Sequence, residues 1–483
     1  NRYSLLQGRG LSPFVQTVNG ASTILPAVDD RSEFAVSGAY LQQNFKFNNQ
    51  LFLTGAVRLD GSSVFGEDER NQTYFKGSAS YLVSESDFWK SNMAWWNLFK
   101  LRVAYGQSGN LTGIGAYSRF NTYSSNSFLS RTALNSRPDL ANEHVKPERQ
   151  DELEIGTDMS FFRDRLGLQF NLYKKKVKDL LFNRLIAPTT GFSSLLDNFG
   201  SLENKGFEVV LNGAPIVQKD LRWDITLIYN HNRNKVLELG PALTLLSTTN
   251  GAPVALIEGY PVGVFYGTFF AKDAGGNLVK NSTGFPQTEK GTQNTQISPA
   301  SYTPQRDANG LPTGTTLRKV IGNPNPDYTA SLTNELTYKK LGLRLQFDAV
   351  QGVDVFNADF RTRQGVGNGP EAQKEQMGIY PRGYINSIYG IEQWRVDDGS
   401  FVKLREASLS YDLGTFKFFK DVSVSLSGRN LISWDNYRGY DPEVNSGGQS
   451  TILRGVDFGS VPIPRTFRFG INDRGRPAGR PRQ

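Results

Sequence analysis

Side chains able to do acid–base, nucleophilic or metal chemistry are few in this chain. It has no cysteine and two histidines, His144 and His231, which excludes thiolate sites and disfavours multi-histidine zinc sites. Glu152 and Glu154 form the most obvious carboxylate pair, but on one strand they project in parallel, and no facing second acid can be identified. We therefore expect no enzyme and no cofactor.

Two acidic stretches superficially resemble metal-binding loops: Asp273-Ala-Gly-Gly-Asn277 and Asp307-Ala-Asn-Gly310. Both have too few oxygen ligands for a calcium loop. Asp, Asn and Gly are also the residues that favour tight turns. We predict turns there and no metal site.

The positive charge is not organised as a nucleic-acid-binding surface would require. The formal net charge is +8, but four arginines fall in the last eleven residues, and the other basic residues are scattered. One dense run, Lys174-Lys175-Lys176-Val177-Lys178, ends an alternating segment. We expect no nucleic-acid partner, because a basic face or stripe is missing.

The elements that must position these side chains are β-strands, because apolar and polar residues alternate with period two. Leu166, Leu168, Phe170 and Leu172 interleave with Gly167, Gln169, Asn171 and Tyr173. Such a two-faced strand fits a soluble sandwich, propeller or solenoid, and equally a membrane barrel with a polar lumen. No apolar run reaches the roughly 18 residues of a transmembrane helix.

The spacing of the alternating segments favours the membrane barrel. Tight turns such as Asn48-Asn49, 162–165 and Lys339-Lys340 alternate with the long connections 109–149, 236–327, 351–401 and 430–463. Transmembrane barrels have short turns at one end and long loops at the other, whereas long loops are uncommon in compact soluble domains. The predicted strands are thirteen: 34–47, 50–60, 73–83, 98–108, 150–161, 166–180, 198–212, 221–235, 328–338, 341–350, 402–413, 420–429 and 464–472.

Nine short strings, in order along the chain, carry a family resemblance. They are Arg58-Leu-Asp-Gly-Ser-Ser-Val-Phe65, Leu101-Arg-Val-Ala-Tyr-Gly-Gln-Ser-Gly-Asn110, Lys146-Pro-Glu148 with Glu152, Glu154 and Gly156, Asn204-Lys-Gly-Phe-Glu208, Glu258-Gly-Tyr-Pro-Val-Gly263, Gly322-Asn-Pro-Asn-Pro-Asp327, Asp398-Gly-Ser-Phe-Val-Lys-Leu-Arg405, Gly439-Tyr-Asp-Pro-Glu443 and Pro464-Arg-Thr-Phe467. Together they resemble the C-terminal half of SusC/RagA-like TonB-dependent outer-membrane transporters of the Bacteroidetes type.

The resemblance implies an all-β fold: about thirteen strands, numbers 10 to 22, of a 22-stranded transmembrane antiparallel barrel with long extracellular loops. Residues 1–33 would be an extracellular loop segment and 34–472 the C-terminal part of the barrel. Residues 473–483, rich in Arg, Gly and Pro, would be a disordered tail. Because the chain begins at Asn1 without Met, we interpret it as part of a longer precursor.

The resemblance also implies a function and its partners. The protein would lie in the outer membrane of a Gram-negative, Bacteroidetes-like bacterium and import oligosaccharides or peptides. A SusD-like surface lipoprotein would act as its lid, and TonB would act through a plug region outside this chain. The alternative is a non-transport outer-membrane barrel, either secretion-associated or adhesive.

The expected site residues form three groups. Lumen-facing charged residues are Arg58, Asp60, Arg102, Glu152, Glu154, Asp158, Arg344 and Asp348. Aromatic candidates for substrate contact are Tyr260, Phe265, Tyr266, Tyr389 and Trp394. Lys174, Lys176 and Lys178 continue the apolar phase of their strand and are expected to face the lipid-phosphate layer of the outer membrane, with Lys175 facing the lumen or a loop.

Overall fold

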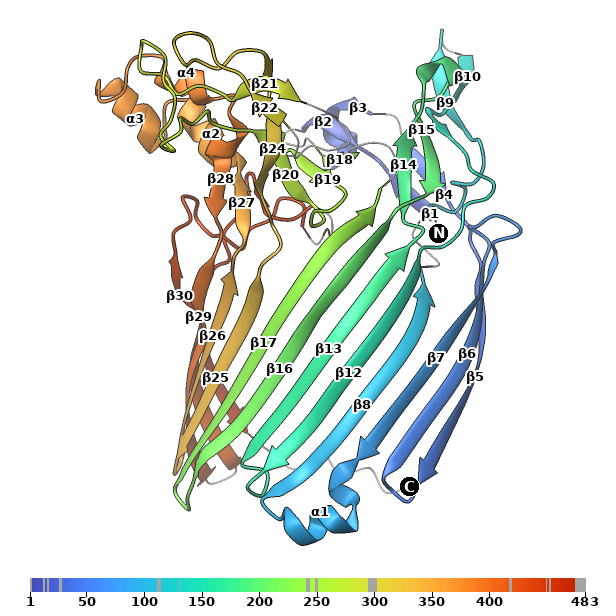
Figure 1. Ribbon diagram of the computed structural model, residues 1–483, viewed down its shortest axis with the longest axis vertical. Helices are drawn as coiled ribbons and strands as arrows, with labels where there is room; N and C mark the ends of the chain where they lie inside the picture. Colours follow the sequence, from blue (N-terminus) through green and yellow to red (C-terminus); the bar gives the residue numbers. More distant parts are fainter. Residues whose placement is uncertain are drawn as a thin grey trace.

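In the computed structural model, thirteen long strands form one antiparallel sheet in which each strand pairs with the next in chain order (Figure 1). The structure describes residues 2–11, 14, 17–25, 28–110, 114–129, 131–239, 244–247, 251–293, 302–416, 419–448, 450 and 453–473. The strands are β5 (Val36–Phe47), β6 (Leu51–Ser62), β7 (Asn71–Leu82), β8 (Trp96–Gly109), β12 (Arg149–Phe161), β13 (Leu166–Lys178), β16 (Ser201–Val217), β17 (Leu221–Glu238), β25 (Tyr328–Tyr338), β26 (Leu341–Gln351), β29 (Phe401–Phe416), β30 (Phe419–Asp435) and β32 (Thr466–Asp473). All thirteen predicted strands are confirmed. Of the predicted tail 473–483, Asp473 is instead the last residue of β32, and 474–483 lie outside the described residues.

We call this thirteen-stranded sheet the wall. Its two ends differ in the way that the alternation of tight turns and long loops in the sequence predicted. Tight turns close one end: Asn48 and Asn49 have φ of 46° and 57°, and Lys339 has φ of 52°. Asn tolerates this left-handed conformation and is favoured in two-residue hairpin turns. The long connections gather at the opposite end, at the top of Figure 1.

The strand register separates an apolar face from a polar one. Ile155 pairs with Val103 and Leu172 on the neighbouring strands, and Gly156 pairs with Arg102 and Asn171. Directly opposed residues point to the same side of a sheet, so the two sets stay apart across the wall. Leu172 is 46% exposed and Ile155 52% exposed. The sheet therefore exposes a broad apolar surface, as a surface that contacts lipid would.

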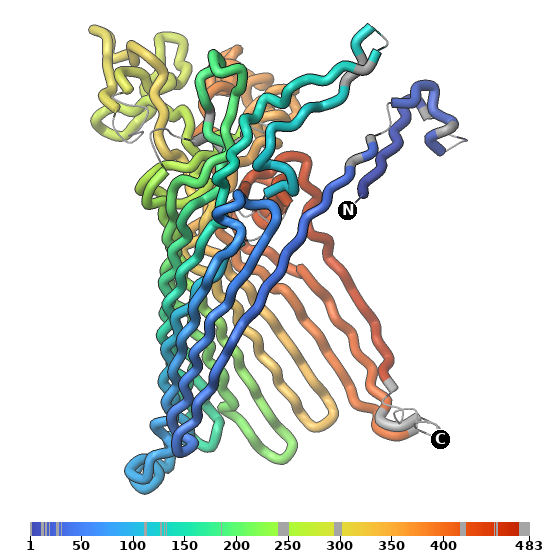
Figure 2. Tube along the Cα trace, turned by 90° about the vertical axis from the view of Figure 1, so that its right-hand side faces the viewer, coloured from blue at the N-terminus to red at the C-terminus, as the bar shows by residue number. Residues whose placement is uncertain are grey.

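The wall is curved, and its two edge strands are β5 and β32 (Figure 2, blue and red). The buried hydrophobic clusters of the described residues lie outside the middle of the strands, at the end of the long loops. The largest combines Val254, Phe265, Phe356, Ala358 and Val456. The wall is therefore not the shell of a water-excluding protein core.

The long loops fold into one cap over that end of the wall. A four-stranded sheet comprises β18 (Thr244–Ser247), β19 (Val254–Leu256), β20 (Val264–Thr268) and β24 (Arg318–Gly322). A three-stranded sheet comprises β27 (Asp354–Asn357), β28 (Val396–Asp398) and β31 (Val456–Asp457), next to the helices α2 (Ala358–Gly365), α3 (Pro370–Gln376) and α4 (Tyr384–Ile388). Because the cap core draws on three separate loops, these loops form one unit.

Smaller hairpins extend the same end. They are β1 (Arg2–Leu5) with β4 (Val28–Arg31), β2 (Gly8–Leu11) with β3 (Ala21–Ile24), β9 (Tyr123–Phe128) with β10 (Arg131–Ser136), β14 (Leu181–Leu185) with β15 (Ser194–Asn198) and β11 (Asp139–Leu140), and β21 (Lys290–Gln293) with β22 (Tyr302–Pro304) and β23 (Thr315–Thr316).

The turn end carries an aromatic cluster beside the short helix α1 (Asp87–Asn92). Trp96 lies between Trp89 and Phe161, with ring centroids 4.6 and 5.1 Å away. Aromatic rings of this kind gather where a barrel crosses a membrane–water interface. In the described part of the chain, no helix combines the length and apolarity needed to cross a bilayer.

Candidate functional site

The polar face of the wall carries ion pairs both within and between strands. Arg102 on β8 contacts Asp158 on β12 at 2.8 Å, and Arg58 contacts Asp60 at 2.7 Å within β6. Arg344 pairs with Glu335 on the neighbouring strand. The strand register places all eight charged residues expected on the lumen side on this one face: Arg58, Asp60, Arg102, Glu152, Glu154, Asp158, Arg344 and Asp348.

A buried ion network fastens the cap to this face. Lys403 on β29 contacts Asp441 at 2.6 Å and Glu443 at 2.7 Å, and its side chain is 5% exposed. Arg405 joins Glu443 at 2.7 Å to Asp348 of the wall, also at 2.7 Å. Burial disfavours ionised Asp441, but hydrogen bonds from Lys403 and from backbone amides outweigh it and hold the pKa of this carboxyl below its usual range. The last long loop is thus tied to the wall by paired charges.

A second fastening uses side-chain amides. Asn234 at the top of β17 donates to Asn325 Oδ1 at 2.9 Å and accepts from the Val262 amide at 2.6 Å. Asn325 in turn donates to the Val262 carbonyl at 2.8 Å. Two loop segments more than 60 residues apart are thereby held against one strand.

These contacts involve several of the short sequence strings that carried the family resemblance. Asp398–Arg405 meets Gly439–Glu443 through the ion network. Glu258–Gly263 meets Gly322–Asp327 through the amides. In the same way Gly66, next to the first string, donates its amide to the Val145 carbonyl beside Lys146-Pro147. Two pairs of the strings therefore contact each other directly although they are far apart in the sequence.

A polar recess of about 580 Å³ lies where the wall meets the cap. Its wall side is formed by Glu152, Tyr173, Lys175, Asn204, Asn230, Asn232 and Asn234, and its cap side includes Val262, Asn325 and Arg454. Within the described ranges, the side-chain amides of Asn204, Asn230 and Asn232 have no hydrogen-bond partner. Each such amide offers both a donor and an acceptor. The recess can therefore bind neutral polar groups such as sugar hydroxyls or peptide amides.

This recess was not predicted from the sequence, although a signal was present. Asn230, Asn232 and Asn234 occupy alternate positions of one strand. Alternate positions point to one face, so the spacing alone could have indicated an amide row. Its closure by Asn325 and Val262 could not be foreseen.

The aromatic candidates for substrate contact lie in the cap, in two kinds of environment. Phe265 and Tyr266 are 0% and 5% exposed and pack into the cap core, so their rings offer no free stacking face here. Tyr260 and Trp394 are half-buried; Trp394 packs edge-on against Phe360. Tyr389, also half-buried, has the Arg361 guanidinium 4.8 Å from its ring.

The two acidic stretches form turns. The carboxylate of Asp273 accepts the Asn277 amide at 2.9 Å, and that of Asp307 accepts the Asn309 amide at 2.8 Å. In the described residues, no group of three or more His, Cys, Asp or Glu residues could hold a metal ion.

The lysine run lies at the cap end of β13. By register, Lys174, Lys176 and Lys178 share the apolar face with Leu172, while Lys175 is opposite Glu152 on the polar face and lines the recess. Lys174 pairs with Glu203 at 3.0 Å and Lys178 with Asp151 at 2.9 Å.

Comparisons with known proteins agree on one family. Residues 2–431 match the family described as TonB dependent receptor-like, beta-barrel. TonB-dependent receptor P26 of Formosa agariphila is 30% identical over 92% of this chain and 46% of its own length. TonB-dependent receptor SusC of Bacteroides thetaiotaomicron is 27% identical over 89% of this chain and 42% of its own length. The chain thus spans about half the length of the curated relatives it matches.

A solved structure shows the same fold. The RagAB peptide transporter structure aligns with a TM-score of 0.77 at 20% identity, over 95% of this chain and 50% of that one.

Proposed function

This chain belongs to the TonB-dependent receptor-like β-barrel family, and from that premise we propose that it is part of an outer-membrane transporter that imports oligosaccharides or peptides. A SusD-like lipoprotein would cover the cap side, and TonB would act through a plug supplied by the rest of the protein. RagAB, which shares the fold, is named as a peptide transporter, and SusC is a named relative.

The architecture supports a barrel with a wide interior. In the described sheet, β5 and β32 are edges that do not pair with each other. An unpaired strand edge in lipid leaves backbone groups without hydrogen bonds. We infer that further strands close the barrel and that the polar face lines its lumen.

The observation that carries the proposal is the amide-lined recess at the cap end of that face. Asn204, Asn230 and Asn232 offer unpaired amides beside the aromatic ring of Tyr173 on the same face. Amides and rings together suit a neutral polar polymer, because amides pair with hydroxyl and peptide groups while rings stack on sugars or side chains. This surface would receive the cargo where it enters the lumen.

The test is uptake by whole cells that express the full-length protein in place of a deleted copy. Depletion of defined oligosaccharide and oligopeptide pools from the medium is followed by mass spectrometry, with and without an uncoupler of the proton gradient. We expect one class of compound to be depleted only by energised, expressing cells. Depletion unaffected by deletion and uncoupling would favour the non-transport alternative, a secretion-associated or adhesive barrel.

A matched pair of variants locates the binding surface. Asn230→Ala/Asn232→Ala should lower uptake about tenfold at low substrate concentration, since each lost hydrogen bond contributes about 0.5–1.5 kcal/mol. Gln42→Ala/Gln169→Ala removes two amides from the same face outside the recess and should leave uptake unchanged.

A further inference from the structure

Four adjacent strands change from apolar to basic on their outward face. Across β12, β13, β16 and β17, one row of paired residues is Ile155, Leu172, Phe207 and His231. The next row toward the cap is Leu153, Lys174, Lys205 and Arg233. Above it lie Asp151, Lys176, Glu203 and Lys235, and then Arg149 and Lys178. The apolar surface thus ends at a band of seven cations and two carboxylates.

The central cations stand side by side. Lys174 is directly paired with Lys205, and Lys205 with Arg233. Adjacent strands are about 4.8 Å apart, so the three cations span roughly 10 Å. Like charges directly opposite each other are destabilising in a sheet, which is a reason to expect an anion there.

The protein itself supplies only part of the negative charge needed to neutralise these cations. Glu203 lies 3.0 Å from Lys174 and 3.9 Å from Lys205. Among the described residues, no carboxylate lies within 4.0 Å of Arg233, Lys176 or Lys235. An external anion would complete the neutralisation.

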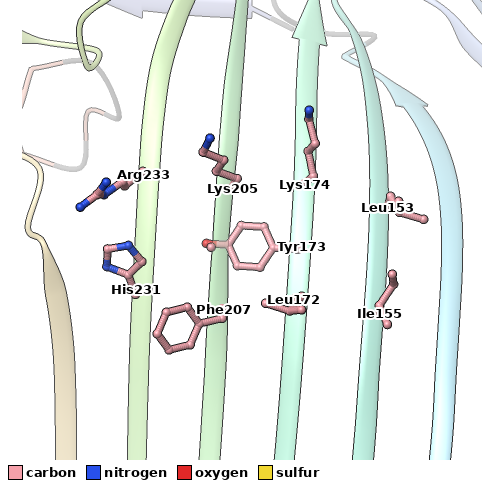
Figure 3. A pocket seen from close by; sticks show the side chains of 10 residues that line it. Leu153, Ile155, Leu172, Tyr173, Lys174, Lys205, Phe207, His231 and Arg233 are labelled. Carbon is pink, nitrogen blue, oxygen red and sulfur yellow. The ribbon is translucent and has the colours of Figure 1, made fainter.

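The three cations line a concavity of about 480 Å³ together with apolar side chains (Figure 3). Lys174 and Lys205 extend toward the cap end, while Leu172, Phe207 and Ile155 lie below them. A ligand seated here would therefore place a negative group among the cations and an apolar part against the wall.

The cations are confined to this part of the wall. In the described strands β5 to β8, β25, β26 and β29, the outward positions carry no Lys, Arg, Asp or Glu. A general basic rim would have placed charges on those strands too. The clustering indicates one local site.

We propose that Lys174, Lys205 and Arg233 bind the phosphate of an outer-leaflet lipid, whose acyl chains lie along Leu153, Ile155, Leu172 and Phe207. Lysine and arginine bind phosphate through charge-assisted hydrogen bonds. A free phosphate would gain nothing from the apolar wall, whereas a lipid would bury its chains there. Of the three lysines expected from the sequence, only Lys174 belongs to this row; Lys205 and Arg233 come from neighbouring strands. The inference rests on the outer-membrane placement proposed above.

The experiment uses the full-length protein in phosphatidylcholine nanodiscs doped with phosphorylated or with fully dephosphorylated lipid A, followed by native mass spectrometry. The variant is Lys174→Gln/Lys205→Gln/Arg233→Gln. The control, Lys272→Gln/Lys280→Gln/Lys290→Gln, removes three cations from the cap. We expect retained phosphorylated lipid to fall about fivefold for each cation removed, because a cation near an anionic lipid surface contributes about 1 kcal/mol.

Retention of phosphorylated lipid by wild type and control, and its loss in the variant, would support the site. Equal retention by the variant, or equal retention of dephosphorylated lipid by wild type, would overturn it. Arg233→Gln alone leaves Glu203 with both lysines, so it remains a test if the triple variant misfolds. Normal substrate uptake by the variant would show that a lost lipid site and a lost transport function are separate results.

Discussion

Replacing Lys403 by Met should release the last long loop from the wall while leaving the barrel intact. Lys403 is 5% exposed and is the ion-pair partner of Asp441, whose side chain is 9% exposed. Removing one member of a buried pair costs about 3–5 kcal/mol, because the other charge stays buried without its partner.

The structure favours the lower end of that range. Asp441 would still accept the backbone amides of Glu443 at 3.0 Å and Ile463 at 3.1 Å. Glu443 would keep Arg405 at 2.7 Å. We therefore expect about 3 kcal/mol, which is roughly a 100-fold rise in loop opening at 1.4 kcal/mol per tenfold.

Hydrogen exchange of the amides in 439–448, measured by mass spectrometry on the full-length protein, reports that opening. The matched control is Arg222→Met, whose ion pair with Asp224 is 58% and 33% exposed. An exposed pair contributes about 0.2–1 kcal/mol, so exchange should rise only a few-fold and only near Arg222.

A Lys403→Met variant whose exchange in 439–448 rises no more than that of Arg222→Met would refute this reasoning. The double variant Lys403→Met/Asp441→Asn provides a further check. It replaces the isolated carboxylate by a neutral amide, so it should restore part of the lost protection.

Three further results are expected. Leu343→Arg puts a charge on the apolar face and should lower the free energy of unfolding in lipid by about 2–4 kcal/mol. Gln346→Arg, on the polar face of the same strand, should be tolerated. Equal tolerance of the two variants in refolding titrations would argue against lipid contact. The pKa of Asp441 is lowered in the folded state, so this carboxylate should stabilise the docked loop above about pH 4, its pKa in the unfolded chain. The effect should be lost as pH falls through its pKa in the folded protein. Exchange protection of 439–448 that stays constant down to pH 2 would contradict this. Gly206→Ala should destabilise by about 1–3 kcal/mol in thermal unfolding, since its Cβ would overlap a backbone carbonyl of β17, while Gly77→Ala, with open space around it, should not.

The local chemistry of the sequence was enough to place the strands. Alternation along Leu166–Leu172 depends only on which side of a strand each residue points to, and that has a fixed period of two. Turn signals are local too, as Asn48-Asn49 shows. Hence the thirteen strands, their order and the end that carries the long loops could all be predicted.

Whether a single loop residue is buried or exposed was harder to predict, because this depends on its neighbours in space. Phe265 and Tyr266 were candidates for substrate contact because aromatic residues in loops can stack on ligands. Phe265 is buried because Phe356 and Val456, from two other loops, pack against it, and Tyr266 is buried against Ala255 and Ile257 of its own long loop. Burial in the cap depends on contacts between segments far apart in the sequence, which periodicity does not report.

The same reason explains what only the tertiary structure decided. Lys174, Lys205 and Arg233 are separated by about 30 residues each in the sequence, and the register of three strands brings them into one row. Lys403 and Asp441 meet only because the last long loop folds back over the wall. Which face a residue occupies is fixed by its own strand, but which residues share a site is fixed by register and loop packing, and these follow from the whole chain.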